Sequence, residues 1–525
     1  MGDAPRRRDD VVAGLMGAAA AVLGAGIGEL TAAIVAPASS PFAAIGGAII
    51  DAAPPWGKDL AIALFGTNDK IALLTGIAIV LVLIAAAAGV LERRVPPWGR
   101  VTLGAIGVVG AIVAQTRADA TAVAWLPAVV AGGVSAIALG LLVRLLRPKP
   151  DTDTDTDTDT DTDTDTDTDT PNRRQALVWM GVVAVAGVAA ATAGNIARAG
   201  ARAVTVVRDL VRLPAPAVAG PAIPASAELD ILGLATYVTP NAEFYRIDTA
   251  LVVPQIDPAD WRLRIHGLVE NPVVLTWDEL LALPLEESVT TLTCVSNQVG
   301  GDLIGNAVWL GYPIRELLAR AVPQADADMV LSTSIDGFTA GTPIEALTDD
   351  RNAILAVGMN GEPLPAEHGF PVRMVVPGLY GYASATKWVV DLEVTRFDQA
   401  QGYWTPRGWS ALGPIKLESR IDVPRQGVVV PAGETVIAGV AWQQHVGVSA
   451  VEVQVDDGPW QQAQLASTVS DDTWVQWSIP WSATSGTHTI RCRATNADGE
   501  TQTEERASPA PDGATGWDSI ITNVS

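Results

Sequence analysis

Residues 291–306 read TLTCVSNQVGGDLIGN and place Cys294 in a Gly- and Asn-rich loop directly after a β-type run. Glycine lets the backbone approach a ligand closely, and a thiolate is a preferred ligand for soft metals. The loop therefore makes Cys294 a candidate metal ligand. On local features alone, the alternative is a small buried hydrophobic side chain, which is the commonest role of a free cysteine.

Three further segments surround this loop: NAEFYRIDTALVVPQIDPADWRLRIHGLVENP at 241–272, MNGEPLPAEHGFPVRMVVPGLYGYASATKWVVDLEV at 359–394 and GYWTPRGWS at 402–410. In this order and spacing they resemble the molybdopterin-binding domain of the sulfite oxidase family, over about residues 226–525. A single cysteine thiolate ligates molybdenum in that family. The resemblance therefore implies a Mo-molybdopterin cofactor, with Cys294 as the metal ligand and catalytic residue.

The resemblance also carries the family's cofactor contacts onto this sequence. Arg373 and Lys387 are cations suited to a phosphate-bearing pterin, and Arg373 can form a forked pair of hydrogen bonds. His368 offers a ring nitrogen to phosphate or pterin. The full set of cofactor-binding candidates is Asn241, Phe244, Tyr245, Cys294, Ser334, His368, Arg373, Ala385, Thr386 and Lys387.

The substrate pocket departs from the family pattern. Sulfite-oxidising members follow the metal cysteine with arginines that hold the anion, whereas this chain has Gln298 and Val299 there. A tyrosine near the metal in those enzymes corresponds to Phe338. An anion needs charge-assisted donors in a desolvated pocket, so we expect poor sulfite oxidation unless Arg246 compensates. Arg246, Gln298 and Phe338 are the substrate-pocket candidates.

Composition separates the first 200 residues from the rest, because twelve of the 16 tryptophans and all four histidines follow position 200. We predict an α-helical membrane region, an α+β sulfite-oxidase-type molybdopterin domain and a C-terminal all-β immunoglobulin-like sandwich. The expected parts are 1–147 (four-span membrane region), 148–174 (disordered Asp-Thr linker), 175–198 (fifth span with a twin-arginine-like flank), 199–225 (Pro/Ala tether), 226–400 (molybdopterin-binding oxidoreductase domain), 401–420 (connector) and 421–525 (sandwich).

Apolar stretches near 11–36, 71–91, 101–116, 121–146 and 177–197 predict five membrane spans, the third being the shortest. The segment 41–66 is interrupted by proline and charge, so we expect an extracytoplasmic or interfacial loop, with another span as the alternative. Basic residues precede span one and lie between spans two and three and between spans four and five. The positive-inside rule then places these on the cytoplasmic side and the C-terminal domain outside the cell.

A ten-fold Asp-Thr repeat occupies residues 151–170. It has no apolar residue and repels itself, so we expect an extended, disordered spacer. The repeat supplies ten of the acidic residues behind the formal charge of −24. This charge argues against a nucleic-acid partner.

Arg173 and Arg174 precede a weakly apolar, Gly/Ala-rich span, which resembles an internal twin-arginine export signal. The alternative is that both arginines are only the cytoplasmic flank of a helix. Export in the folded state suits a molybdopterin enzyme, because the cofactor is inserted into folded protein in the cytoplasm.

Strand-like runs at 261–267, 288–293, 370–376 and 387–394 alternate with helix-like runs at 277–283 and 313–321. After about residue 421, alternating apolar and polar residues between Asp/Gly turns predict the antiparallel sandwich, which in the family often mediates dimerisation. We place Cys492 in its core. We expect no disulfide with Cys294, because the family pattern requires that thiolate for the metal.

No histidine occurs before His266, so the membrane spans cannot hold a bis-histidine haem. We therefore expect electrons to be exchanged with a separate cytochrome or quinol-linked partner. The resulting hypothesis is a membrane-anchored, extracytoplasmic molybdenum-dependent oxidoreductase that transfers an oxygen atom to or from a small S- or N-oxide or a sulfite-like anion. The alternative is a cofactor-free cell-surface binding or sensor module on the same fold.

Overall fold

The computed structural model describes residues 3–36, 39–53, 69–118, 120–145, 170–200 and 203–525. The chain divides into two compact units, which are considered separately. The first unit comprises Met1–Ala203 and Ala250–Val252, and the second comprises Val204–Thr249 and Val253–Ser525.

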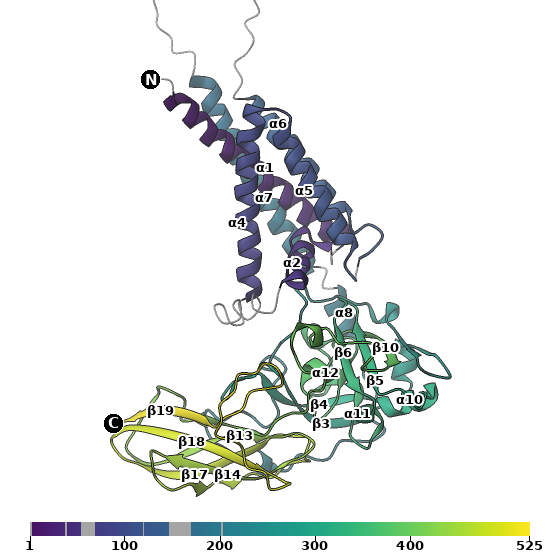
Figure 1. The fold of residues 1–525 in the computed structure, drawn as a ribbon, viewed down its shortest axis with the longest axis vertical. Coiled ribbons are helices and arrows are strands. Elements are labelled where there is room, and N and C mark those ends of the chain that lie inside the picture. The colour runs from purple at the N-terminus through teal and green to yellow at the C-terminus, as the bar shows by residue number, and fades with distance from the viewer. Residues whose placement is uncertain (1–2, 37–38, 54–68, 119, 146–169, 201–202) are drawn as a thin grey trace, which may run out of the picture. The chain divides into compact units, whose positions relative to one another are not determined.

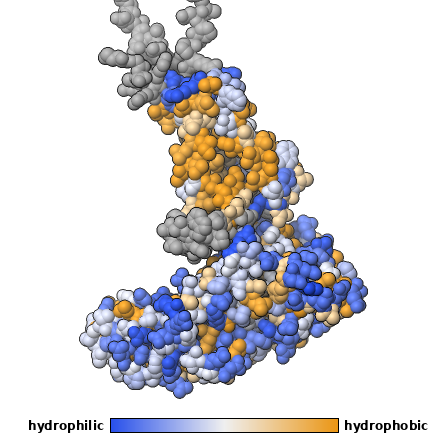
Figure 2. All heavy atoms as spheres, viewed as in Figure 1, coloured by the Kyte–Doolittle hydropathy of each residue, from blue (hydrophilic) through white to orange (hydrophobic). Residues whose placement is uncertain are grey.

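The described part of the first unit is helical (Figure 1). Its helices are α1 (Asp3–Val35), α2 (Pro41–Ala52), α4 (Asp69–Arg94), α5 (Trp98–Gln115), α6 (Leu126–Arg144) and α7 (Thr170–Gly200). All but α2 contain a segment long and apolar enough to cross a membrane. These five segments match the five predicted spans. The visible face of the unit is largely apolar, in contrast to the mainly polar face of the second unit (Figure 2).

Small residues allow α1 to pack closely against α4, α6 and α7. A Cβ atom at Gly17 would lie 2.0 Å from the Ala85 carbonyl oxygen of α4, and one at Gly26 would lie 2.0 Å from the Gly187 carbonyl oxygen of α7. Only glycine fits at both positions. Close backbone approach at small residues is the usual way in which membrane helices associate.

Charged residues gather where α1 begins and α4 ends. Arg93 lies 2.5 Å from Asp10 and 3.0 Å from Asp9, both on α1. Arg100, at the start of α5, pairs with the buried Glu92 at 2.8 Å. A Cβ atom at Gly140, near the end of α6, would lie 2.7 Å from the Arg100 side chain. The basic ends of these helices therefore meet at one end of the unit.

One prediction in this region was wrong. The segment expected to be a loop from residue 41 contains the helix α2, whose first residue is Pro41 and whose N-cap is Ser40. Proline favours the first position of a helix, where its missing N–H needs no partner. Residues 54–66 of that segment lie outside the described residues, as does the Asp-Thr repeat except for Thr170. Arg173 and Arg174 belong to α7, but their side chains are not among those described.

The second unit contains two sheets before residue 400 (Figure 1). The strands of the first sheet, in spatial order, are β2 (Val273–Thr276), β1 (Arg262–Gly267), β10 (Val389–Thr395), β5 (Met329–Ser334) and β6 (Thr339–Pro343). Those of the second are β3 (Glu286–Thr293), β4 (Ile304–Pro313), β7 (Ile354–Met359) and β8 (Glu362–Pro363), with β9 (Arg373–Val375) also pairing with β7. The β1–β10 pair is parallel and the other pairs are antiparallel.

Short helices connect these strands. They are α8 (Ala203–Leu210), η3 (Ala225–Ala227), η4 (Pro258–Asp260), α9 (Trp277–Leu281), α10 (Ile314–Ala321), α11 (Glu345–Thr348), η5 (Ala366–His368), α12 (Gly381–Ser384) and η6 (Thr405–Arg407). The α+β pattern expected from the sequence is present, with element ends displaced by a few residues. The largest difference is β9, which is shorter than the expected 370–376 because Pro371 cannot donate to a ladder.

The expected Pro/Ala tether at 199–225 is not a free spacer. Arg208, on α8, donates hydrogen bonds to the carbonyl oxygens of Pro363 and Leu364. Farther along, Ala217 N donates to Leu285 O at 2.7 Å, and Val218 forms a parallel bridge with Glu286. Non-proline residues between the prolines retain their N–H groups, so the segment can lie along the start of β3.

Two further sheets follow residue 417. One has the order β11 (Glu418–Val423), β13 (Gly433–Trp442), β17 (Val475–Ala483) and β16 (Gln464–Leu465). The other has the order β12 (Val429–Val430), β19 (Asp518–Val524), β18 (Gly486–Asn496), β14 (Val448–Val455) and β15 (Gln461–Gln462). One buried cluster joins them and includes Trp477 from one sheet with Val451 and Cys492 from the other. The inward position predicted for Cys492 is therefore confirmed.

These C-terminal sheets contact the strand that leads to Cys294. Thr291 N donates to Asp472 O at 3.0 Å, and Gln444 Nε2 donates to Thr293 Oγ1 at 2.9 Å. Trp442 and Trp474 share a buried cluster with Val295. The loop that carries the cysteine is thus held from the C-terminal side as well as by its own strands.

Candidate functional site

Cys294 follows the last residue of β3 and begins the loop that returns to β4. Its N–H donates to Leu303 O at 3.0 Å, which closes the base of the loop. The thiol is buried, and Cys294 Sγ lies 2.9 Å from Ser296 Oγ. Burial raises the pKa of this thiol, while Ser296 and the nearby Lys387 ammonium favour the thiolate. A cation or metal at this position would therefore stabilise the charged form.

Phe244 lies at the centre of an aromatic group beside Cys294. Its ring stacks on Tyr245 with centroids 5.3 Å apart and meets Trp309 and His368 edge-on at 5.7 and 5.6 Å. Burial raises the pKa of Tyr245, and the negative Cys294 thiolate adds to this effect. Residues from NAEFY, β4 and HGFPVR are therefore brought into one site, as the motif resemblance implies.

Arg373, the first residue of β9, is a buried cation in this site. Nη1 donates to His368 O at 3.1 Å, and Nη2 donates to Ala385 O at 3.4 Å. The guanidinium carbon lies 5.1 Å from the centroid of the Trp309 ring. Burial lowers the pKa of Arg373 to about 10, so the guanidinium is charged at neutral pH. Its hydrogen bonds within the described residues go to neutral carbonyl oxygens, which leave the positive charge available to an anion.

His368 ends η5, and Gly369 follows in the left-handed region with φ +114°. His368 Nε2 lies 3.0 Å from Asn241 O. Burial, together with the smaller effect of the Arg373 and Lys387 cations, lowers the pKa of His368 to about 4. The ring is therefore neutral at pH 7. It donates to Asn241 O through Nε2 if the proton resides there, and Nδ1 is then an acceptor.

Lys387 forms a nearly buried ion pair. Its Nζ lies 2.7 Å from Asp248 Oδ2, and their side chains are 9% and 5% exposed. Nζ also donates to Glu367 O at 3.0 Å. Burial lowers the pKa of Lys387 to about 8, while Asp248 raises it. Arg246 Nε contacts the same Asp248 oxygen at 2.8 Å, so two cations share one carboxylate.

The remaining cofactor candidates line the same region. Ser334, at the end of β5, is buried, and its Oγ has no hydrogen-bond partner among the described residues. Thr386 Oγ1 lies 2.7 Å from Ser332 Oγ, and Met374 N donates to Thr386 O. The Ala385 carbonyl accepts from Arg373. Asn241 Nδ2 donates hydrogen bonds to Met359 O and to the Glu362 carboxylate. The contact of Asn241 with His368 is made by its main-chain oxygen.

The substrate-pocket candidates are more scattered. Gln298 is exposed in the loop after Cys294, and its carbonyl oxygen accepts from Gly301 N. Phe338, in the β5–β6 turn, lies 5.8 Å from the Tyr403 ring. Arg246 is held by Asp248. Among the described residues, no hydrogen bond, ion pair or ring contact joins these three side chains to one another.

The described residues fit a molybdenum-bearing pterin with a phosphate group. Cys294 offers a buried sulfur, and Ser334 Oγ has no hydrogen-bond partner among the described residues. Two buried cations lie in the same region: Lys387, which shares Asp248 with Arg246, and Arg373, whose hydrogen bonds within the described residues go to carbonyl oxygens. The described part of the chain contains no group of three His, Cys, Asp or Glu side chains arranged for a metal ion. A metal at Cys294 would therefore depend on the pterin for its other ligands.

Several contacts could not be found from sequence. Asp248 lies within the 241–272 segment, but nothing in that sequence marks it as a partner of Lys387. The two residues meet only in the folded chain. Trp309 lies under Arg373 because β4 follows the cysteine loop. The contact between Ser296 and Cys294 could have been expected from sequence, because a hydroxyl two residues after the thiol can reach it.

Comparison with known proteins identifies this region. Residues 250–404 match the family described as the oxidoreductase molybdopterin binding domain. The chain is 32% identical over 157 residues to the uncharacterized oxidoreductase YuiH of Bacillus subtilis, covering 30% of this chain and 76% of that protein. It is 31% identical over 272 residues to the mitochondrial sulfite oxidase of Mus musculus, covering 44% of this chain and 49% of the relative.

The chain thus spans about half the length of the mammalian sulfite oxidases that it matches. Among solved structures, the sulfane dehydrogenase SoxCD from Paracoccus pantotrophus aligns with a TM-score of 0.49 and 23% identity. That alignment covers 55% of this chain and 84% of the other.

Proposed function

Because this chain belongs to the sulfite oxidase family of molybdopterin-dependent oxidoreductases, we propose that it is a membrane-anchored, extracytoplasmic enzyme acting on a small S- or N-oxide. The chain is a molybdenum-dependent oxidoreductase with a Mo-molybdopterin cofactor. The observation that carries the proposal is the Cys294 site, where a buried thiol shares its surroundings with Arg373 and Lys387.

When bound, the cofactor supplies transfer of an oxygen atom and two electrons. Cys294 Sγ would bind the metal, and Ser296 Oγ at 2.9 Å would help to keep the sulfur as a thiolate. Arg373 and Lys387 would bind the phosphate, and the neutral His368 ring would hold a pterin heteroatom or phosphate oxygen. Ser334 Oγ would gain the partner that it lacks.

The charges around the pocket favour a neutral substrate over an anion. Two cations of the site already have assigned roles at the cofactor, and Arg246 is paired with Asp248 at 2.8 Å. The loop after Cys294 presents Gln298 and Val299, where arginines bind the anion in sulfite-oxidising relatives. A neutral S- or N-oxide needs hydrogen-bond donors but no full countercharge. Reduction of such an oxide and oxidation of the product are both compatible with this pocket.

Five helices long and apolar enough to cross a membrane support membrane anchoring, and charged residues gather at one end of the helical unit. If that end is cytoplasmic, an odd number of spans places the second unit outside. Arg173 and Arg174 would then act as an internal twin-arginine signal. Electrons would be exchanged with a separate cytochrome or quinol-linked membrane protein, and the C-terminal immunoglobulin-like sandwich would form a homodimer.

The alternative is a surface binding or sensor module that uses the same fold without the cofactor. Uncompensated buried charge is costly. Without an anionic cofactor, the buried Arg373 and Lys387 would have only the Asp248 carboxylate to balance them, and Lys387 already shares that carboxylate with Arg246. Arg373 and Lys387 are nonetheless buried around Cys294. Their burial supports the enzyme.

Substrate choice is tested with molybdenum-loaded full-length protein by comparing reduction of a neutral sulfoxide with oxidation of sulfite. We expect kcat/KM to favour the sulfoxide. Gln298→Arg with Val299→Arg should lower KM for sulfite while changing that for the sulfoxide little, since only the anion gains charge-assisted bonds. The matched control is Gln461→Arg with Gln462→Arg, two exposed positions on β15. Efficient sulfite turnover by the unmodified enzyme would refute the neutral-substrate proposal.

A further inference from the structure

The loop after Cys294 is fastened to β11 of the C-terminal sheets. Asn297 N donates to Cys294 O at 3.0 Å, and Asn297 Oδ1 accepts from Leu303 N at 2.9 Å. Arg420, on β11, donates from Nη1 to Gly301 O at 2.8 Å. These hydrogen bonds connect β11 and Asn297 to the backbone of the cysteine loop.

Glu418, the first residue of β11, lies beneath this loop. It is 2% exposed, and its Oε2 has no hydrogen-bond partner among the described residues. The Asn297 side chain lies beside the carboxyl and favours its charged form. The contact is weak, because Asn297 Nδ2 has no hydrogen-bond partner among the described residues. A buried carboxyl with so few partners is unusual, because a buried carboxylate normally either pairs with a cation or takes up a proton and becomes neutral.

The groups that face Glu418 come from several elements. Burial raises the pKa of Glu418 to about 8; Asn297 and Lys416 lower it, and Asp518 on β19 raises it. Burial raises the pKa of Tyr380, which precedes α12, and the negative charge of Glu418 raises it further. Arg420 is paired with Asp422 at 2.7 Å. Glu418 is therefore a buried carboxyl whose pKa of about 8 lies close to neutral pH.

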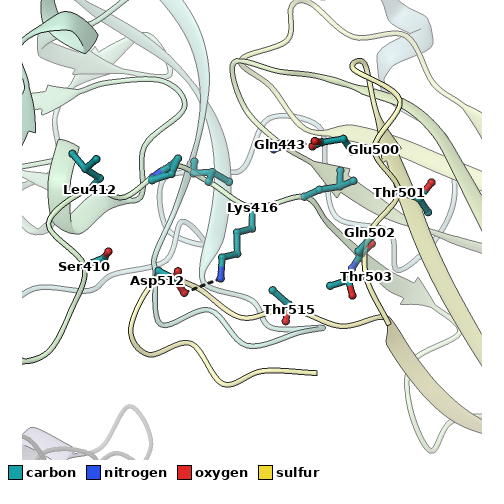
Figure 3. Close-up of a pocket in the computed structure, with 13 residues that line it drawn as sticks. Ser410, Leu412, Lys416, Gln443, Glu500, Thr501, Gln502, Thr503, Asp512 and Thr515 are labelled. Atoms are coloured by element: carbon teal, nitrogen blue, oxygen red, sulfur yellow. Dashed lines mark hydrogen bonds and ion pairs between the residues drawn. The ribbon is translucent and has the colours of Figure 1, made fainter. Parts of the chain in front are cut away.

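A solvent-open groove begins on the other side of the same segment (Figure 3). It has a volume of about 630 Å³, and Lys416 and Leu417 form part of its wall. Lys416 Nζ lies 2.8 Å from Asp512 Oδ1 across the groove, and Lys416 N donates to the Tyr380 hydroxyl at 3.3 Å. Glu418 directly follows these two wall residues in the chain, and its own side chain is buried.

We propose that Glu418 is a proton-holding positioning residue whose protonation follows the oxidation state of the metal at Cys294. This inference rests on the proposed function. Gain of one electron at the metal site from the carrier protein would be accompanied by binding of one proton from solvent to the Glu418 carboxylate, so that no net charge would be added to this part of the fold. Oxidation by the carrier reverses both transfers. Electron and proton binding are then linked reciprocally, as any two coupled equilibria must be.

The coupling predicts a pH-dependent metal potential. A tenfold change in proton activity corresponds to about 59 mV for one electron, and full coupling would give this slope per pH unit. We therefore expect the midpoint potential of full-length, molybdenum-loaded protein to fall with rising pH between pH 6 and 9. The measurement is a redox titration that follows the Mo(V) electron paramagnetic resonance signal.

Glu418→Gln keeps the shape of the side chain but cannot titrate, so the slope should be lost while the Mo(V) signal remains. Glu434→Gln, an exposed position on β13, is the matched control and should retain the slope. Lys416→Met removes a cation that favours ionised Glu418, so the slope should persist to higher pH. This variant tests the coupling even if Glu418→Gln fails to fold.

The outcomes separate the two proposals. A Mo(V) signal whose potential does not vary with pH in the wild-type protein would overturn the role of Glu418 and leave the oxidoreductase intact. A slope that survives unchanged in Glu418→Gln would do the same, because another group would then hold the proton. Absence of any molybdenum signal from protein made in a molybdopterin-producing host would overturn the proposed function itself.

Discussion

Lys387 Nζ lies 2.7 Å from Asp248 Oδ2 in an almost fully buried pair, and Arg246 contacts the same oxygen. This carboxylate allows a cation to remain charged at the cofactor site although burial lowers the Lys387 pKa to about 8. Asp248 thus positions the ammonium without being a cofactor contact itself.

Asp248→Asn should destabilise the second unit by about 3 kcal/mol at pH 6, because it leaves a buried ammonium without its countercharge. The folded-state pKa of Lys387 lies below its ordinary value, so stability falls as pH falls from 10.5 to about 8 and levels off below that, where the folded lysine is charged too. The effect of the substitution should therefore be smaller at pH 9. Urea unfolding followed by tryptophan fluorescence at both pH values measures it.

The matched control is Asp326→Asn, which removes an exposed partner of Arg396. It should change the unfolding free energy by less than about 0.5 kcal/mol at either pH. Equal destabilisation by Asp248→Asn at pH 6 and pH 9 would contradict the assigned role of the Lys387 charge.

Arg373→Met tests whether the buried guanidinium serves the cofactor or the fold. The substitution leaves the carbonyl oxygens of His368 and Ala385 without their donor, which should cost about 1–3 kcal/mol of stability. Molybdenum content should fall at least tenfold, because the phosphate loses a forked cation. Metal analysis beside urea unfolding separates the two effects.

Arg396→Met, at a partly exposed ion pair, is the control for Arg373→Met and should leave the molybdenum content unchanged. Full molybdenum content in Arg373→Met would show that this guanidinium does not hold the cofactor.

Arg173→Lys with Arg174→Lys tests the export signal. The pair keeps its positive charge, so the positive-inside rule predicts no change of topology, whereas a twin-arginine receptor would no longer find its guanidinium groups. We expect the second unit to be lost from the cell exterior, as judged by protease digestion of intact cells. The matched control is Arg93→Lys with Arg94→Lys at the end of α4. Normal export of the Arg173/Arg174 variant would leave these arginines as a helix flank only.

Sequence patterns identified the features that depend on local order. The β-type run before Cys294 and the five apolar segments need only periodicity and composition to be recognised. Phe244, His368 and Arg373, which the motif resemblance assigns to one cofactor, lie close together in the fold, as their ring and hydrogen-bond contacts show.

Contacts between distant segments were not predictable in this way. Asp248 reaches Lys387 and Glu418 lies beneath the Cys294 loop only because the folded strands bring them together. The helix α2 was missed because the prolines and charge around it were read as a loop, although Pro41 begins a helix. The Pro/Ala segment was misjudged because its free N–H groups pair with the start of β3.

The most direct test of the account is molybdenum content in Cys294→Ser. Full-length protein is purified from a molybdopterin-producing host, and Cys492→Ser, the other buried free cysteine, is the matched control. A serine hydroxyl is a harder and far less acidic ligand than a thiol. We predict near-stoichiometric molybdenum in the wild-type and Cys492→Ser proteins and at least a tenfold loss in Cys294→Ser. Equal molybdenum in Cys294→Ser and the wild type would contradict ligation by Cys294, and wild-type protein without molybdenum would contradict the oxidoreductase itself.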